Sequence, residues 1–440
     1  MVTKRTLGLL PLISVMYLVV SGGAYGLEDA VRLAGPRLTI ILCLIVPLTL
    51  SVPTALMAAE LTALMPVEGG FYFWVKEAMG PFAGFAEAYL TILYTAVDMA
   101  IYPGLFAAYL GFLIPIGPVM SVLLAIALIW ISGALNLLGI RPVGFTSVIL
   151  AAILLSPFAA LVIVGSPNLI HFVAPAQPLY GPGFLGALGA GLTVVIWNFG
   201  GWENLSVVSG ELDNPKRNYL RAITVALPIV LIGYLLPLMV CLSGAHSTAD
   251  WQMGWFSHEG RRIGGPALGV ALALGGAVMA FAVFEAAMLW VSRMPYILAR
   301  ERYLPVRFAD IWQTTETPWK SIVLCCAVFT ILLTLGFIAL VVLDVFFYMG
   351  ALTLEMIALL KLRRTRPDRE GLFVIGGGKL GLVMVAALPL ITWVATFSLA
   401  ISQGGAHIDF IIAVALALTV WPAYAIARRR YGGPPIRSSI

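Results

Sequence analysis

Three acidic residues stand well inside long apolar runs of this 440-residue chain: Asp98, Glu203 and Glu285. An ionisable side chain is costly to place at depth in such a run, so its default interpretation is functional. The sequence places no Lys or Arg at mid-run beside them. Each carboxyl group therefore binds a proton, takes its counter-charge from a cationic ligand, or does both. The alternative is a protonated carboxyl that hydrogen-bonds to its neighbours and serves packing alone.

Aromatic residues accompany these acids. Tyr94, Asp98 and Tyr102 follow one another at intervals of four residues, so they share one face of a helix. Further aromatic residues flank two glycine-rich segments: Tyr25, Trp197 and Trp202. Aromatic rings beside carboxylates suit an alkylammonium chain through cation–π and apolar contact, although Trp and Tyr are also common at packing seams. We expect Asp98 and Glu203 to recognise a substrate ammonium group in a cavity shaped by Tyr102, Trp197 and Trp202.

Two apolar runs are interrupted by glycine pairs, at residues 21–26 (SGGAYG) and 198–204 (NFGGWEN). Glycine lowers helix propensity, and unpaired backbone in a membrane costs several kcal/mol per group unless it lines a cavity or is covered by protein. Free N–H groups at such a break carry partial positive charge. The predicted binding residues at the first break are Ser21, Gly22, Gly23 and Tyr25. Close helix packing through small residues is the alternative.

The elements that must position these residues follow from composition. Apolar residues make up 61% of the chain and charged residues 11%, against about 45–50% and 25% in soluble proteins. We expect an all-α integral membrane protein with twelve transmembrane helices, each spanning about 30 Å of hydrocarbon. The predicted spans are 7–34, 37–64, 82–114, 117–138, 142–165, 184–212, 219–243, 265–293, 319–341, 342–361, 380–402 and 408–427.

The basic residues predict the orientation of these spans. Only four of the 26 lysines and arginines fall on one side of the predicted membrane, and the other 22 fall on the opposite side. The four are Arg32, Arg37, Arg261 and Arg262. This asymmetry predicts a multi-pass protein of the cell membrane with both termini in the cytoplasm. It also explains the net charge of +5 by contact with anionic membrane lipid, not nucleic acid.

The sequence argues against an enzyme, a metal site and a cofactor. The four histidines fall in predicted outside loops, and the four cysteines lie in apolar segments without metal-ligand spacing. A membrane-embedded redox or metal enzyme needs ligands or proton carriers at depth. A passive channel or an unusual membrane enzyme stays as the alternative from another class.

The two breaks lie five spans apart and so enter the membrane from opposite sides. This arrangement is typical of an inverted five-helix repeat with discontinuous helices 1 and 6, the LeuT-type fold. The predicted units are residues 1–180, residues 181–362 and a C-terminal part at 363–440. Glu60 and Glu87 fall near helix ends, where partial solvation favours a structural role, and residues 244–264 are expected to be a hydrophilic connector.

At the breaks the sequence resembles a known superfamily. Residues 20–29 (VSGGAYGLED) are close to the pattern SGGP[FY]G[VL]ED, with Ala24 in place of proline, and Val97-Asp98 with Tyr102-Pro103 are similar to VDNALYP. Further matches are Pro53, Glu60, Gly69-Gly70, Trp74, Gly80-Pro81-Phe82, Trp197-Asn198, Trp202-Glu203, Gly210-Glu211, Asn214-Pro215, Phe284-Glu285 and residues 299–305. Over roughly residues 18–310 the chain resembles the amino acid–polyamine–organocation (APC) superfamily, most closely the polyamine–proton symporter family known from plants.

This resemblance implies a secondary transporter that works by alternating access. In amino-acid-transporting relatives the first break holds the substrate carboxylate. Glu285 falls near the place where other relatives bind sodium, so a protonatable carboxyl there, together with Glu203, implies proton coupling. Because a diamine brings two positive charges and a zwitterion none, the deep acids favour a polyamine or related organic cation. A cationic or neutral amino acid transporter or exchanger remains the alternative.

Overall fold

The computed structural model describes residues 7–170, 172, 183–243, 248, 251, 252, 254–333, 337–366, 371–402 and 407–433. Within these ranges the regular structure is helical, and extended pairing is limited to two isolated bridges. Ten helical stretches in this part of the chain are long and apolar enough to cross a membrane. The chain is therefore an all-α, multi-pass membrane protein.

The helices follow the apolar runs of the sequence, and several begin with proline, whose missing N–H would be unpaired at that position anyway. The first half contains α1 (Leu9–Val20), α2 (Leu27–Ala34), α3 (Pro36–Val46), the π-helical turn η1 (Pro47–Ser51), α4 (Val52–Leu64), α5 (Gly70–Met79), α6 (Pro81–Leu113), α7 (Pro118–Leu137) and α8 (Ile140–Leu169). The second half contains α9 (Phe184–Phe199), the 3-10 helix η2 (Asn204–Glu211), α10 (Pro215–Leu242), α11 (Trp255–Val291), α12 (Arg293–Arg300), the 3-10 turn η3 (Val306–Ala309), α13 (Trp319–Leu332), α14 (Phe337–Thr365), α15 (Gly378–Ser402), α16 (His407–Leu418) and α17 (Val420–Tyr431).

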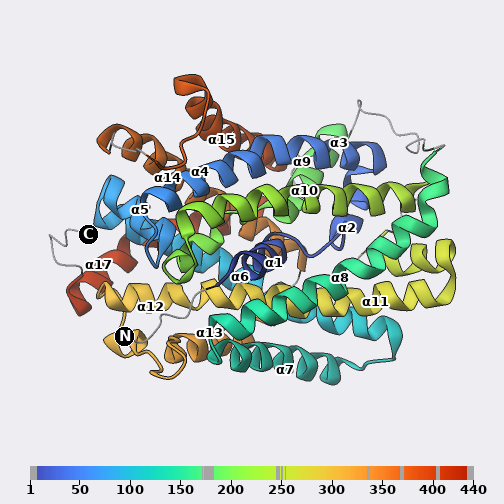
Figure 1. Ribbon diagram of the computed structural model, residues 1–440, viewed down its shortest axis with the longest axis horizontal. Helices are drawn as coiled ribbons and strands as arrows, with labels where there is room; N and C mark the ends of the chain where they lie inside the picture. Colours follow the sequence, from blue (N-terminus) through green and yellow to red (C-terminus); the bar gives the residue numbers. More distant parts are fainter. Residues whose placement is uncertain are drawn as a thin grey trace.

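The short helix α1 lies inside the bundle and packs against α8, α10 and α11 (Figure 1). The long helix α6 packs against both α11 and α14. These helices run roughly along the long axis of the molecule, and we call its two ends by the elements found there. The proximal end holds α5, α12 and α17, and the distal end holds α2 and the start of α11 (Figure 1).

One predicted helix boundary is wrong. The sequence prediction divides spans nine and ten between residues 341 and 342, whereas α13 ends at Leu332 and α14 begins at Phe337. The residues after Phe337 are as apolar as those before the boundary, so composition does not mark it. The shift matters for Asp344, which lies two full turns inside α14 and not at the start of a helix.

The prediction of a connector over residues 244–264 is also wrong in part. α11 begins at Trp255 and continues through a kink at Gly265, whose φ of 80° is outside the helical range. Glycine adopts this conformation without the steric penalty of a side chain. The first ten residues of α11 therefore form a separate helical segment that covers the distal end.

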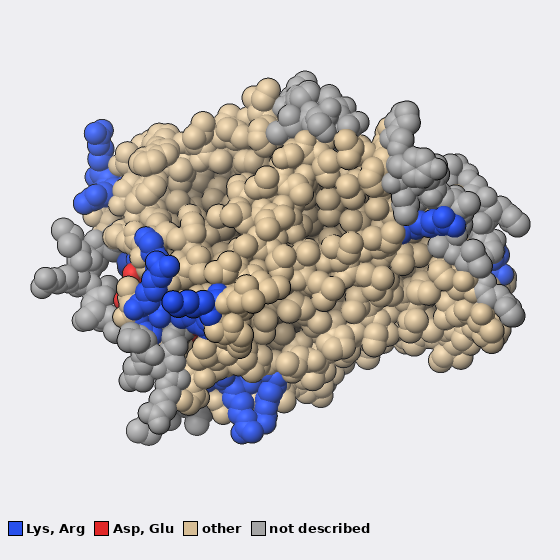
Figure 2. Space-filling view, turned by 90° about the horizontal axis from the view of Figure 1, so that it is seen from above, with Lys and Arg blue, Asp and Glu red and all other residues tan. Residues whose placement is uncertain are grey.

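The surface fits a lipid environment. Many large apolar side chains are exposed on α7, α8 and α15, among them Val119, Ile163 and Leu380. A broad band free of coloured residues separates the Lys and Arg side chains of the two ends on the face drawn in Figure 2. Bare apolar surface of this extent is unfavourable in water and favourable against hydrocarbon.

Candidate functional site

Two helices are broken at the centre of the bundle. α1 ends at Val20, and α2 begins at Leu27 after six residues that are not helical. α9 ends at Phe199, and η2 begins at Asn204. Both breaks coincide with the glycine pairs that predicted them.

The two breaks face each other closely. Gly26 has a φ of 93°, and a Cβ atom added there would lie 3.0 Å from the Trp197 ring. At Gly22 an added Cβ would lie 2.8 Å from the sulfur of Met279. Backbone conformation favours glycine at Gly26, whereas at Gly22 the Met279 side chain on α11 would have to shift to admit a Cβ atom.

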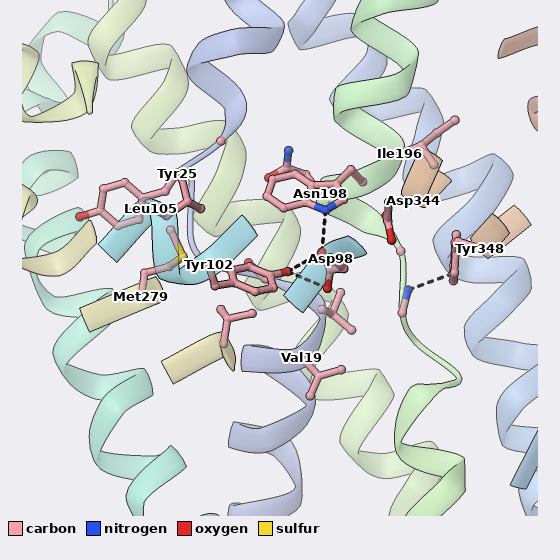
Figure 3. Close-up of a pocket in the computed structure, with 18 of the residues that line it drawn as sticks. Val19, Tyr25, Asp98, Tyr102, Leu105, Ile196, Asn198, Met279, Asp344 and Tyr348 are labelled. Atoms are coloured by element: carbon pink, nitrogen blue, oxygen red, sulfur yellow. Dashed lines mark hydrogen bonds between the residues drawn. The ribbon is translucent and has the colours of Figure 1, made fainter. Parts of the chain in front are cut away.

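A cavity of about 70 Å³ lies between the breaks and helices α6, α11 and α14 (Figure 3). Ser21, Gly22 and Tyr25 line it from the first break. Asp98, Tyr102 and Trp197 line it from α6 and α9. The structure therefore brings together six of the nine predicted substrate-binding residues.

Asp98 is held in this cavity by two side-chain hydrogen-bond donors. The Tyr102 hydroxyl donates to its two carboxylate oxygens at 3.1 and 3.2 Å, and the Trp197 Nε1–H donates to Oδ1 at 3.0 Å. The Tyr102 and Trp197 rings lie nearly parallel, with centroids 6.3 Å apart. Pro103 has no N–H to donate within α6, which frees the carbonyl of Met99, the residue next to Asp98. The carboxylate is thus held by two donors at the edges of two aromatic rings.

A second acid lines the same cavity and escaped the sequence prediction. Asp344 on α14 is 5% exposed, and its Oδ1 atom has no hydrogen-bond partner among the described residues. Figure 3 shows Asp344 and Asp98 on different helices around the cavity. The misplaced boundary before α14 hid this residue, although an aspartate within the run VVLDVFFYMG was the signal that could have found it.

Glu203 and Trp202 lie beside the cavity and do not line it. The Tyr348 hydroxyl accepts the Gly201 N–H at 2.9 Å and donates to Glu203 Oε2 at 3.3 Å. Trp202 is buried, and its Nε1–H donates to the Phe199 carbonyl at 3.1 Å. This hydrogen bond satisfies a backbone carbonyl at the end of α9, within the second break. Tyr348 lines the cavity, and Glu203 lies behind it. Gly23, the third predicted residue outside the lining, packs against the ring of Phe158.

Two further buried acids lie within electrostatic range of Glu203: Glu87 on α6 and Glu355 on α14. Thr91 donates to Glu87 Oε1 at 2.7 Å, while Glu87 Oε2 and Glu355 Oε2 have no hydrogen-bond partner in the part of the chain that is described. The expectation of partial solvation at Glu87 and Glu60 is wrong, because both are buried. Glu60 instead binds the Arg363 guanidinium, with oxygen–nitrogen distances of 3.0 and 2.8 Å.

Glu285 lies where α11 meets α7 and α8. Thr146 donates to its Oε1 at 2.7 Å, and Asn136 donates to its backbone carbonyl at 3.0 Å. Its Oε2 is buried and unpaired within the described structure. The structure thus keeps Glu285 apart from the cavity that holds Asp98.

Aromatic rings cover the cavity towards the distal end. The Tyr25 ring packs against Phe158, Tyr109 and Phe256 with centroid distances of 4.6, 5.3 and 6.2 Å, and its hydroxyl donates to the Leu272 carbonyl. Beside it, Glu28 accepts the backbone N–H groups of Gly26 at 2.6 Å and Gly254 at 3.3 Å. Glu28 therefore braces the first break against the start of α11, and Asp29 pairs with Arg32.

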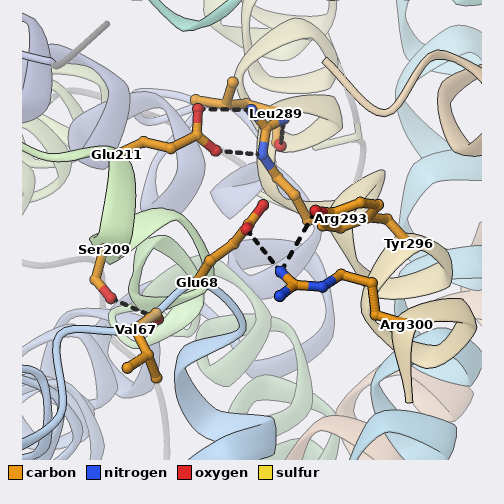
Figure 4. Close-up of polar contacts among 8 residues, drawn as sticks. All are labelled: Val67, Glu68, Ser209, Glu211, Leu289, Arg293, Tyr296 and Arg300. Atoms are coloured by element: carbon orange, nitrogen blue, oxygen red, sulfur yellow. Dashed lines mark hydrogen bonds and ion pairs between the residues drawn. The ribbon is translucent and has the colours of Figure 1, made fainter. Parts of the chain in front are cut away.

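Charged contacts close the proximal end (Figure 4). Arg293 is 1% exposed and binds Glu211 through two contacts of 2.9 and 3.1 Å, which joins α12 to η2. Arg300 reaches Glu68 at 3.3 Å in a more exposed pair, and Lys76 pairs with Glu301. The Arg300–Glu68 and Lys76–Glu301 pairs connect elements from the two halves of the chain, so they tie the proximal ends of the helices together.

The described residues contain no group of His, Cys, Asp and Glu arranged to hold a metal ion. The four cysteines are buried and unpaired with one another. Of the four histidines, His171 and His246 lie outside the described residues, as do the basic residues Lys4 and Arg5.

A bundle of apolar helices around a cavity lined by two aspartates is typical of membrane transporters. A family model described as amino acid permease matches residues 7–421. Polyamine transporter RMV1 of Arabidopsis thaliana is 31% identical over 88% of this chain and 79% of its own length. Polyamine transporter PUT1 of Oryza sativa is 29% identical over 97% and 80%, and an uncharacterized transporter of Legionella pneumophila is 27% identical over 79% and 80%. The chain therefore belongs to the amino acid permease family, and the resemblance to the APC superfamily is confirmed.

Proposed function

We propose that this protein imports polyamines or related organic cations across the cell membrane, driven by protons, through alternating access. One observation carries the proposal. Asp98 lines the cavity between Tyr102 and Trp197, and no Lys, Arg or His is among the described lining residues. A negatively charged, aromatic cavity is complementary to an alkylammonium group. The names of the plant relatives agree with this substrate class.

The second candidate is transport or exchange of an amino acid. Ser21 and Gly22 line the cavity at the first break, where backbone N–H groups suit a carboxylate. The Gly23 N–H, however, already donates to Ser21 Oγ at 3.1 Å. A zwitterion would also leave the charge of Asp98 without net compensation. We therefore place amino acids second.

We assign proton coupling to Glu203 and Glu285. Each is buried, neither lines the substrate cavity, and Glu285 keeps one oxygen unpaired within the described structure. Such carboxyl groups can gain and lose protons without direct contact with substrate. The position of Glu203 behind Tyr348 favours this role over direct contact with an ammonium group.

The proposed architecture has twelve membrane crossings with the proximal end in the cytoplasm. In this proposal α1 and α2 form the first crossing, α9 and η2 the sixth, the short α13 the ninth, and α16 with α17 the twelfth. Residues 1–180 and 181–362 form the inverted repeats, and residues 363–440 carry the last two crossings. The concentration of basic residues on the proximal side supports this orientation.

Competition for uptake tests the substrate class. Protein reconstituted into liposomes takes up labelled putrescine, and unlabelled spermidine, arginine, lysine, leucine and alanine compete. We expect spermidine to compete best, the cationic amino acids less, and leucine and alanine least. Best competition by a neutral amino acid would reject the polyamine assignment and establish the second candidate.

A further inference from the structure

Two carboxylates line the cavity, those of Asp98 and Asp344. Asp344 enters it from α14, at 5% exposure and with Oδ1 unpaired among the described atoms, while Asp98 enters from α6. The two are close enough to interact electrostatically. Asp98 accepts hydrogen bonds from two side chains. In the described structure, by contrast, no donor reaches Oδ1 of Asp344.

The groups that face this pair do not supply a positive charge. The titratable side chains around the described cavity are Tyr25, Tyr94, Tyr102, Tyr109, Tyr234 and Tyr348, contributed by the first break, α6, α10 and α14. Glu203 stands behind Tyr348 and adds a further negative group. Phenol groups donate hydrogen bonds but stay neutral near pH 7. The surroundings therefore add repulsion to the pair and no compensating cation.

Two carboxylates that share a desolvated space cannot both carry full charge without a counter-charge. They retain one proton between them, and the proton belongs to the pair more than to either residue. An ammonium group that enters the cavity brings both a positive charge and N–H donors. It therefore compensates the repulsion between the two carboxylates that the shared proton had relieved.

We propose that Asp98 and Asp344 form a joint binding site that holds one proton when empty and exchanges it for a charged amine nitrogen of the substrate. On binding, the carboxyl O–H bond breaks and its proton passes to water, while the two carboxylates accept hydrogen bonds from the amine. Charge within the cavity is unchanged by this exchange. The inference rests on the proposed function, since it requires a cationic substrate. Because this exchange by itself moves one proton opposite to the amine, proton-driven import requires the coupling carboxyls Glu203 and Glu285 to carry more than one proton inward.

Proton release on binding is the direct test. Purified protein is titrated calorimetrically with putrescine and spermidine at one pH, in two buffers that differ in ionisation enthalpy. The difference between the observed enthalpies gives the protons released per amine bound. We expect a release of one proton for the unmodified protein, and an affinity that rises by about tenfold per pH unit while the proton is still bound.

Two variants locate the proton. Asp344→Asn is expected to bind amines with no proton release and with a flat dependence of affinity on pH. Asp310→Asn, the same change at an exposed residue paired with Lys320, should behave as the unmodified protein does.

The outcomes separate the inference from the proposed function. Amine binding without proton release overturns the inference alone, and so does release that persists in Asp344→Asn. Absence of any putrescine or spermidine binding overturns the proposed function and the inference with it. The measurement on unmodified protein needs no variant, so it decides even where Asp344→Asn fails to fold.

Discussion

At the scale of single residues, the position of Asp98 in the cavity is set by two aromatic donors. Tyr102 and Trp197 donate hydrogen bonds to Asp98 from the edges of their rings, which lie nearly parallel to each other. Because the donors come from α6 and α9, the carboxylate is held across two helices. A substitution by asparagine can therefore remove the charge of Asp98 and keep an oxygen that accepts these hydrogen bonds.

Asp98→Asn should weaken binding of putrescine at least about tenfold, equivalent to roughly 1.4 kcal/mol. The asparagine keeps an oxygen that accepts from Tyr102 and Trp197, so the change removes charge and leaves the geometry in place. The variant should fold, because removing a buried charge relieves its desolvation cost. Affinity is measured by displacement of labelled putrescine, with Asp310→Asn as the surface control. Unchanged affinity would make Asp98 structural.

At the scale of elements, the breaks depend on close approach between chains. The turn from α1 to α2 needs a left-handed conformation at Gly26, and it places that residue against Trp197 and the amide of Asn198. Both the backbone conformation and the close packing therefore favour glycine at this position. The break is part of the tertiary structure and not a weak point in a helix.

Gly26→Ala should abolish amine binding or lower the yield of folded protein. An alanine at a φ of 93° is strained, and its Cβ would lie 3.0 Å from the Trp197 ring that holds Asp98. Gly104→Ala on α6 is the matched control, since no atom lies within 4 Å of its added Cβ. Size-exclusion profiles and putrescine binding report the two effects. Normal binding by Gly26→Ala would show that the break tolerates rearrangement.

The contacts at the proximal end differ in burial, and this difference predicts their contribution to stability. Arg293→Gln removes a buried guanidinium from Glu211, and loss of one partner of a buried pair costs about 3 kcal/mol or more. Arg300→Gln removes an exposed contact with Glu68, which contributes at most about 1 kcal/mol. Thermal unfolding in detergent should therefore show a clear loss of melting temperature for Arg293→Gln and a small one for Arg300→Gln. Equal losses would contradict the burial argument.

At the scale of the whole molecule, the cavity that holds Asp98 and the proposed coupling carboxyls occupy separate places in one bundle. Glu285 lies where α11 meets α7 and α8, and Asp98 lies where α6 faces α14 and the breaks. The central helix α1 contacts both α8 and α11, so it adjoins both regions. A movement of α1 would change the surroundings of both acids together.

Glu285→Gln should abolish accumulation of putrescine driven by an imposed proton gradient while leaving binding largely intact. The glutamine oxygen still accepts from Thr146, but the side chain no longer exchanges a proton. Uptake by the unmodified protein should respond to the proton gradient and ignore replacement of sodium by potassium. Glu77→Gln, in an exposed pair with Arg366, is the control. Uptake that requires sodium and ignores the proton gradient would reject proton coupling.

Much of the site could be predicted because its signals are local. A glycine pair inside an apolar run marks a break wherever the chain folds, and Asp98 with Tyr102 one turn later must share a helix face. Glu203 was predicted from the same kind of local signal, an acid at a glycine break in an apolar run. Its position behind Tyr348, however, depends on α14, a helix distant in the sequence. Local pattern identifies a buried acid but does not say which cavity it faces.

The sequence by itself determined the membrane-embedded helical architecture, the two breaks and the presence of acids at depth, because hydrophobicity, glycine content and charge act through the solvent around each segment. The tertiary structure decided which acids meet. It placed Asp344 beside Asp98, moved Glu203 behind a tyrosine and kept Glu285 apart, because packing between helices sets those distances. Segments far apart in the chain become neighbours only through that packing, and no periodicity within either segment encodes the pairing.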